Sequence, residues 1–233
     1  QYCTAIPVGT LLAQTWDTAL IEEIGEMIGG EMEEFSTTLW LAPGMNIHRN
    51  PLCGRNFEYY SEDPLVAGKI AAAMTNGVQK VPGCGTTIKH FACNNQEDNR
   101  MGSDSIVSER TLREIYLKGF EIAITESQPM SIMTSYNLIN GVHAANNEDT
   151  CTKAARCDWT TTEQGEDCTA SGCMRAGNDL VMPGAFSDRD NLNQELADGT
   201  LSMDDLKACI SRLVNIVWQS NQFENAVPYK KVK

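Results

Sequence analysis

Hydrophobic residues recur every three to four positions in several stretches of the chain, which is the spacing of an amphipathic helix. The pattern is clearest over residues 18–35, where glutamates lie on the opposite face. The apolar positions of this stretch are Leu20, Ile21, Ile24, Met27, Ile28, Met32 and Phe35. Further helices are predicted over residues 64–79, 108–126 and 202–220. The first of these begins with a proline and the last with a serine, and both residue types favour a helix start.

Short apolar runs lie between these helices and predict strands. They cover residues 38–43, 83–88, 130–136 and 178–184. Strand, polar loop and helix, repeated in this order, are typical of a βα array with parallel strands. We therefore predict an α/β fold of the (β/α) barrel type.

Most of the chain is predicted to form one domain. At 233 residues it is long enough for a single barrel-like domain with its own core. We assign residues 1–225 to this domain and the lysine-rich residues 226–233 to a basic tail. The chain starts without Met and without a basic-then-apolar signal pattern, so we expect it to be trimmed at its start.

Charge and composition narrow the classes of function. A net charge of −13 argues against nucleic acid as a partner, and the apolar runs fall short of the ~20 residues that a membrane span needs. Nine cysteines without a Cys-x-x-Cys pair favour reduced thiols, so we expect a cytoplasmic protein. The three histidines are well separated, so a structural metal site is not expected. We also expect no organic cofactor. The expected ligand is small or neutral.

The densest polar cluster follows the second predicted strand, at residues 89–100 (KHFACNNQEDNR). Similar clusters follow other predicted strands, at residues 46–56, at 135–140 and from Asp158 onward. The carboxyl ends of barrel strands carry the chemistry of such folds, so we expect these clusters to form one site. Rigid donors and acceptors at this density suit the hydroxyls of a sugar. The alternative is a polar loop whose side chains satisfy its own turns.

Asp158 is a carboxylate followed directly by an aromatic residue, Trp159. Cleavage of a glycosidic bond by double displacement needs a carboxylate that attacks the anomeric carbon, surrounded by hydrogen-bond donors. Neighbouring Arg and Lys side chains would keep that carboxylate ionised. The Asp-Trp pair alone is a weak signal, because most such pairs are structural.

Long, ordered motifs run through nearly the whole chain. They are WLAPGMNIHR at 40–49, GRNFEYYSEDP at 54–64, KHF at 89–91, NQE at 95–97, SERTLREIY at 108–116, MTSYN at 133–137 and AGNDLVMPG at 176–184. Together they resemble glycoside hydrolase family 3, and most closely its bacterial β-glucosidase branch. The resemblance implies a retaining enzyme that releases β-D-glucose from the non-reducing end of β-glucosides or short β-linked oligosaccharides.

The resemblance also implies roles for individual residues. The sugar-holding residues are Arg55, Lys89, His90 and Arg100, those that line the pocket are Met133, Tyr136 and Trp159, and the catalytic nucleophile is Asp158.

Several of these residues have a structural alternative. Arg55 can instead form an ion pair with Glu58 or Glu62. His90 can be a hydrogen-bonded histidine behind the site, and Met133 can be part of the core. The pair Glu97 and Arg113 is expected to brace the scaffold rather than to contact sugar, and Glu58 is likewise expected to have a scaffold role.

The chain also departs from the family pattern. About ten residues, one strand in length, are missing before Asp158, so we expect an incomplete TIM-type (β/α) barrel. Asp158 then matches either the nucleophile, which the threonines at 160–162 favour, or the acidic residue that precedes the first Trp of that strand. An open barrel edge would also allow a homo-oligomer.

The sequence contains neither the amino-terminal Asp-Gly-Pro motif of the family nor the second domain that usually supplies the general acid/base. The carboxylates that follow Asp158 most closely are Glu163, Glu166 and Asp167. The alternative function is therefore a non-catalytic sugar-binding remnant, or a fragment of a larger glycosidase. Residues 150–168 discriminate between these functions, because an enzyme needs them to present Asp158 to the polar cluster.

Overall fold

The computed structural model describes residues 2–147, 169–182 and 184–221. The helices are α1 (Gly9–Ala13), α2 (Thr18–Glu34), η1 (Asn56–Glu58), α3 (Pro64–Gln79), α4 (Glu109–Thr111), η2 (Leu112–Tyr116), α5 (Lys118–Ser127), η3 (Ala144–Asn146), α7 (Ala170–Arg175), α8 (Phe186–Asp198) and α9 (Met203–Gln219). The strands are β1 (Leu39–Trp40), β2 (Gly85–Phe91), β3 (Asp104–Ser105), β4 (Ser131–Thr134), β5 (Leu138–Ile139) and β6 (Val142–His143). Asp158, Trp159 and the predicted basic tail lie outside the described residues.

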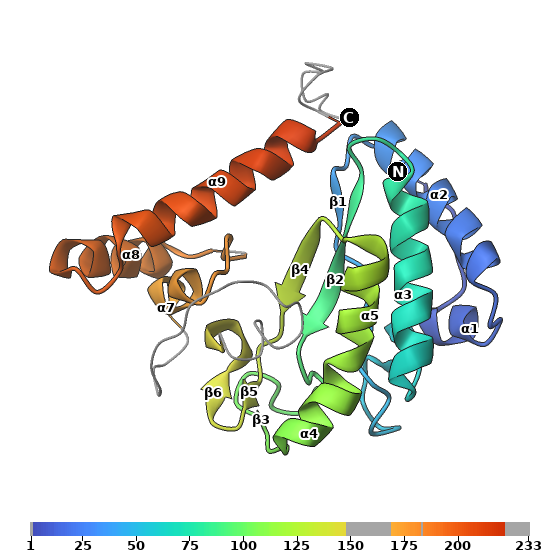
Figure 1. Cartoon of the computed structure of the whole chain (residues 1–233), viewed down its shortest axis with the longest axis horizontal. Coiled ribbons are helices and arrows are strands. Elements are labelled where there is room, and N and C mark those ends of the chain that lie inside the picture. The colour runs from blue at the N-terminus through green and yellow to red at the C-terminus, as the bar shows by residue number, and fades with distance from the viewer. Residues whose placement is uncertain (1, 148–168, 183, 222–233) are drawn as a thin grey trace.

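The main sheet has the order β1-β2-β4, and its strands run parallel. Helix α3 connects β1 to β2, and α5 precedes β4, so strands and helices alternate as predicted (Figure 1). Across the described residues this sheet has three strands and does not close into a barrel. The fold is thus an incomplete (β/α) barrel.

Two long helices match their predicted bounds to within one residue, and each starts at an aspartate cap. The Asp17 carboxylate accepts hydrogen bonds from two backbone N–H groups of the first turn of α2, and Asp63 does the same for α3. These bonds satisfy N–H groups that have no partner inside a helix. Ser202 caps the closing helix α9 as predicted: its hydroxyl accepts from the Asp205 N–H at 3.0 Å, and the helix begins at Met203.

The helix predicted over residues 108–126 is present but interrupted. Ser108 caps its start, accepting from the Thr111 N–H at 3.2 Å. A π-helical turn, η2, then separates α4 from α5. The apolar spacing predicts the helix but not this change of hydrogen-bond pattern, which affects single backbone bonds only.

The prediction of a fourth strand over residues 178–184 is wrong. The described part of this stretch is neither helix nor strand. The Asn178 N–H bonds the carbonyl of Cys173, and the Asp179 carboxylate pairs with Arg212 at 2.7 Å. Leu180 and Met182 are 59% and 57% exposed. An apolar run becomes a strand only where it pairs with a neighbouring strand, and the described part of this run pairs with none.

A second, small sheet follows the main one. Strand β5 pairs with β3 in parallel and with β6 in antiparallel orientation. The turn between β5 and β6 is Asn140-Gly141, with φ of 52° and 87°. Asn and Gly tolerate positive φ, and this dipeptide favours tight hairpins. The polar turn predicted here is thus a β-hairpin.

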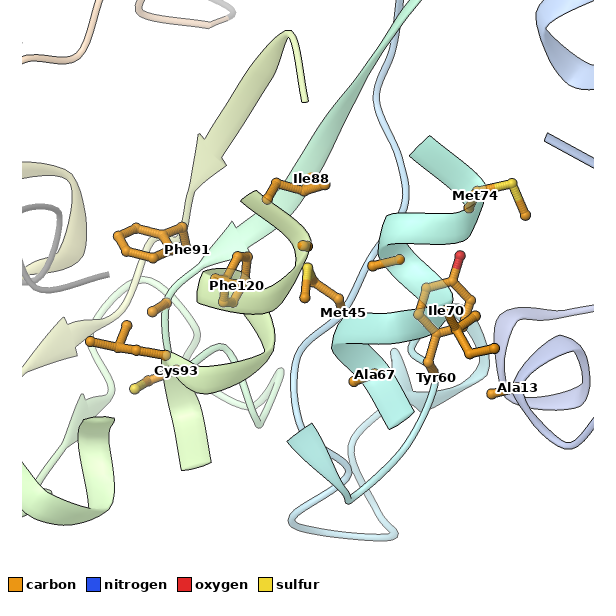
Figure 2. Close-up of a cluster of buried hydrophobic side chains, with 14 of the residues drawn as sticks. Ala13, Met45, Tyr60, Ala67, Ile70, Met74, Ile88, Phe91, Cys93 and Phe120 are labelled. Carbon is orange, nitrogen blue, oxygen red and sulfur yellow. The ribbon is translucent and has the colours of Figure 1, made fainter. Parts of the chain in front are cut away.

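The main core lies between the sheet and its helices (Figure 2). Phe91, at the end of β2, packs edge-on against Phe120 of α5, with ring centroids 5.0 Å apart. Helix α3 packs against both α2 and α5, which explains why almost all of its faces are buried (Figure 1). A separate apolar cluster joins α7 and α9 through Met174, Leu201 and Cys209. No helix in the described ranges is long and apolar enough to cross a membrane.

Cysteine reactivity should follow burial. Cys3 is exposed, whereas Cys93 is buried and its pKa is raised to about 12 by burial. Because the thiolate is the reactive form, iodoacetamide should label Cys3 in the native protein and leave Cys93 unmodified. Peptide mapping by mass spectrometry measures both sites, and labelling in urea provides the control. Rapid native labelling of Cys93 would contradict its burial.

Candidate functional site

The candidate site lies at the carboxyl ends of the parallel strands. Strand β2 ends with Lys89, His90 and Phe91, and the segment after β1 runs beside it. Asn46 of that segment clamps the His90 backbone: its amide oxygen accepts from the His90 N–H at 2.8 Å, and its amino group donates to the His90 carbonyl at 2.9 Å. The clamp fixes the end of β2 relative to the end of β1.

Three cations and two carboxylates form a continuous network at this edge, which we call the ion network: Arg55, Glu58, Lys89, Glu97 and Arg100. Glu58 bonds the Nε of Arg55 with one oxygen and lies 3.4 Å from Lys89 Nζ with the other. Glu97 lies 3.1 Å from Arg100 Nη1 and 4.0 Å from Arg55 Nε. The Lys89 side chain is only 14% exposed. The network therefore holds three positive side chains in place before any ligand is bound.

Two pocket-lining candidates lie beside the ion network. The Arg100 guanidinium sits over the ring of Tyr136 at 5.3 Å from the centroid, within the range of a cation–π contact. Met133 is half-buried and is the register partner of Lys89 in the β2–β4 pair. The structure thus brings together Arg55, Lys89, His90, Arg100, Met133 and Tyr136. Asp158 and Trp159 lie outside the described residues.

His90 is joined to the ion network by a buried hydrogen-bond chain. Tyr59 Oη lies 3.2 Å from His90 Nδ1, Asn94 Nδ2 donates to Tyr59 Oη at 2.9 Å, and the same Nδ2 donates to Glu97 Oε1 at 3.0 Å. Burial and the charges of Arg55, Lys89 and Arg100 lower the pKa of His90 to about 3. His90 is therefore neutral at physiological pH.

The depressed pKa of His90 predicts a pH dependence of stability. Below about pH 6.5 the unfolded chain binds a proton that folded His90 resists, so the free energy of unfolding should fall as the pH falls from 6.5 toward 3. The expected slope reaches about 1.4 kcal/mol per pH unit. Urea unfolding between pH 7 and 5 measures it, and His90→Gln should flatten the profile in this window. A His90 NMR titration with a midpoint near 6.5 would contradict the prediction.

Some of the predicted structural contacts are present in this site. Arg55 does pair with Glu58, but this contact does not remove it from the cluster of cations. Glu58 and Glu97 brace the site directly, by binding its cations. Arg113 is not part of the ion network. It pairs with Glu109, four residues earlier in the chain, at 2.9 Å. Such i,i+4 pairs form locally, which explains why Arg113 and Glu97 are not partners.

Tyr59, Asn94 and Asn46 are absent from the candidates that the sequence suggests. All three are buried: Asn46 binds the backbone of His90, Tyr59 binds its ring, and Asn94 binds Tyr59. A buried tyrosine or asparagine needs hydrogen-bond partners, and Tyr59 follows Glu58 directly in its motif. The motif was the available signal, but the partner of Tyr59 lies 31 residues away and cannot be read from spacing.

Other features nearby are less suited to a polar ligand. A cavity of about 180 Å³ is lined mainly by apolar side chains, among them Ile6, Trp40, Phe57 and Met74, with Glu58 as its one charged lining residue. Such a lining does not satisfy hydroxyl groups. Across the described ranges, no group of three or more His, Cys, Asp or Glu side chains is arranged to hold a metal.

The chain is similar to known proteins over nearly its full length. It is 42% identical to a β-glucosidase of Ruminococcus albus over 93% of this chain and 25% of that protein. It is 39% identical to an exo-α-(1→6)-L-arabinopyranosidase of Bifidobacterium breve over 92% of this chain and 29% of that protein. The structure of β-glucosidase 3B from Thermotoga neapolitana in complex with glucose matches with a TM-score of 0.89 and 43% identity, over 96% of this chain and 33% of that one.

The chain spans about a quarter to a third of the length of these relatives. Residues 1–216 match the family model described as the glycosyl hydrolase family 3 N terminal domain. The parallel strands with intervening helices and the ordered motifs at the strand ends agree with that match, so this chain belongs to glycosyl hydrolase family 3.

Proposed function

We propose that the chain carries the sugar-binding face of a retaining glycoside hydrolase. Its substrate is a β-glucoside or a short β-linked oligosaccharide, and its product is β-D-glucose released from the non-reducing end. The observation that carries the proposal is the ion network beside His90. It gathers Arg55, Lys89 and Arg100 at the carboxyl ends of parallel strands, where barrel enzymes bind substrates.

These side chains match the needs of a sugar ring. Arg and Lys donate hydrogen bonds and cannot accept them, and ring hydroxyls have lone pairs to receive them. Lys89 directs its ammonium toward one carboxylate oxygen at 3.4 Å, which leaves further N–H groups for a ligand. Tyr136, held under Arg100, offers an exposed aromatic surface to the same region. Further support comes from the β-glucosidases named among the relatives, one of them crystallised with glucose.

The proposed reaction is a double displacement. Asp158 attacks the anomeric carbon as the bond from that carbon to the leaving-group oxygen breaks, so the aglycone departs with a proton from a general acid and a glycosyl-enzyme forms. Water then hydrolyses the glycosyl-enzyme and restores the Asp158 carboxylate, and Trp159 stacks against the sugar. Both roles rest on the Asp-Trp motif. The donors of the ion network keep Asp158 ionised and hydrogen-bond the sugar hydroxyls, and the negative charge of Asp158 stabilises the oxocarbenium-like transition state. The route needs carboxyl groups and hydrogen-bond donors only, so we propose no cofactor.

Trapping the glycosyl-enzyme tests this proposal. The protein is incubated with a 2-deoxy-2-fluoro-β-glucoside that bears a dinitrophenolate leaving group, which departs with little acid assistance. We expect a fluoroglucosyl adduct in the intact mass, located on Asp158 by peptide mapping. Asp158→Asn is the matched control and should give no adduct.

Each other outcome has a definite meaning. An adduct on another carboxylate would show that Asp158 is not the nucleophile. Absence of an adduct on a folded protein that still binds glucose would indicate a non-catalytic sugar-binding remnant. A parallel reaction with the corresponding arabinopyranoside would test the alternative substrate that the Bifidobacterium breve relative suggests.

A further inference from the structure

The hydrogen-bond chain behind His90 has a fixed direction, and Glu97 sets it. Glu97 lies 3.1 Å from Arg100 and 4.0 Å from Arg55, so it is an ionised carboxylate that can only accept hydrogen bonds. The Asn94 atom that faces Glu97 at 3.0 Å must therefore be the amino nitrogen Nδ2, because the amide oxygen would be repelled. The orientation of the Asn94 amide follows from this contact.

The orientation of the Asn94 amide in turn determines the direction of its hydrogen bond with Tyr59. The same Nδ2 lies 2.9 Å from Tyr59 Oη and donates to it, so the Tyr59 hydroxyl accepts at this contact. The hydroxyl has one hydrogen left to donate, and His90 Nδ1 lies 3.2 Å from the oxygen. Nδ1 therefore accepts. A neutral imidazole carries one proton, so that proton is on Nε2.

Burial makes the reverse assignment costly. Tyr59, Asn94 and His90 are 0%, 4% and 6% exposed. If His90 Nδ1 carried the proton, Tyr59 would receive two donors, and its own buried hydrogen would have no acceptor among the residues that the structure describes. Leaving a buried donor without a partner costs about 1–3 kcal/mol. The assigned direction satisfies each group of the chain.

We infer that Glu97, Asn94 and Tyr59 act as positioning residues that hold His90 with its proton on Nε2, so that His90 can only donate a hydrogen bond to its ligand. Among the described residues, Nε2 has no protein hydrogen-bond partner, so it remains available to a bound molecule. The identity of that molecule as a sugar rests on the proposed function. The tautomer itself is a property of the free protein.

This direction determines which sugar atoms fit at His90. An Nε2–H group requires a lone pair, so the sugar hydroxyl beside it must act as an acceptor. A deoxy analogue at that position loses the contact, whereas a deoxyfluoro analogue, which can accept weakly but cannot donate, retains part of it. We expect glucose to bind more weakly by about 3–10-fold when the support from Tyr59 is lost, as for one hydrogen bond.

Nitrogen NMR of histidine-labelled protein tests the inference without any ligand. In the wild type we expect His90 Nδ1 to give the signal of a hydrogen-bonded unprotonated nitrogen and Nε2 that of a protonated one. In Tyr59→Phe the Nδ1 signal should shift to that of an unbonded lone pair. Tyr60→Phe changes the neighbouring tyrosine, which packs in the hydrophobic core, and should leave both signals unchanged. Circular dichroism confirms that each variant is folded.

Two results would overturn the inference: a protonated Nδ1 in the wild type, or an unchanged Nδ1 signal in folded Tyr59→Phe. A glucose titration of the same samples separates the two proposals. The expected tautomer without glucose binding would contradict the proposed function alone. Glucose binding with a protonated Nδ1 would contradict the positioning chain alone.

Discussion

Lys89→Met is expected to lower kcat/KM for p-nitrophenyl β-D-glucoside by about 10–150-fold, the effect of losing one hydrogen bond from a charged donor. Met keeps most of the side-chain volume but removes the ammonium group that lies 3.4 Å from Glu58. Glu58 keeps Arg55 as its partner, so the fold should survive. Where turnover is too slow to measure, calorimetric titration with glucose should give a Kd weakened by a similar factor.

Lys80→Met is the matched control for this substitution. Lys80 pairs with Glu22 and Glu26 at the exposed end of α3, away from the strand ends that carry the ion network. Surface ion pairs of this kind contribute little, so the control should remain within about twofold of the wild type. Equal effects of the two substitutions would mean that Lys89 does not contact the sugar.

Gly77→Ala is expected to lower the free energy of unfolding by about 3 kcal/mol or more. Gly77 lies where α3 crosses α2. An added Cβ would meet the Glu22 carbonyl oxygen and lie 2.8 Å from the Cα of Gly25. Backbone atoms cannot rotate away as side chains can, so the two helices would have to separate. Urea unfolding measures the loss.

Gly30→Ala makes the same chemical change on the exposed face of α2. No atom lies within 4 Å of a Cβ added there. Alanine loses less conformational freedom than glycine in a helix, so stability should rise by about 0.5–1 kcal/mol. The two variants should therefore change stability in opposite directions. Stabilisation by both would show that helix propensity, rather than close packing, governs these positions.

The sequence predicts the elements whose apolar residues form one continuous face. Helix α3 has the predicted bounds because a proline starts it and its apolar positions are packed on both sides. Helix α8 was not predicted, since its side chains are mostly polar and none is buried. The strand predicted over 178–184 is absent for a different reason: the run contains apolar residues, but the described part of it pairs with no strand.

In the candidate site, too, some contacts follow from the sequence and others depend on the fold. Placing polar clusters at strand ends correctly brings Lys89 beside Arg55 and Arg100, because parallel strands end at one edge. The support of His90 by Tyr59 depends on a contact across 31 residues, which neither periodicity nor spacing encodes. Glu97 pairs with Arg100, which lies close to it in sequence, and not with Arg113. Only the fold determines which of these two arginines becomes its partner.

The connections of the main sheet determine the order in which the site forms during synthesis. Leu39 pairs with Gly85, and Thr87 pairs with Ser131, so each strand pairs with one about 45 residues further along. At about 5–20 residues per second, a ribosome adds that length in roughly 2–9 s. Lys89 can therefore reach Glu58 once β2 has emerged, whereas Tyr136 meets Arg100 only after β4. The sugar-binding face is assembled from its amino-terminal side, and the aromatic surface joins it last.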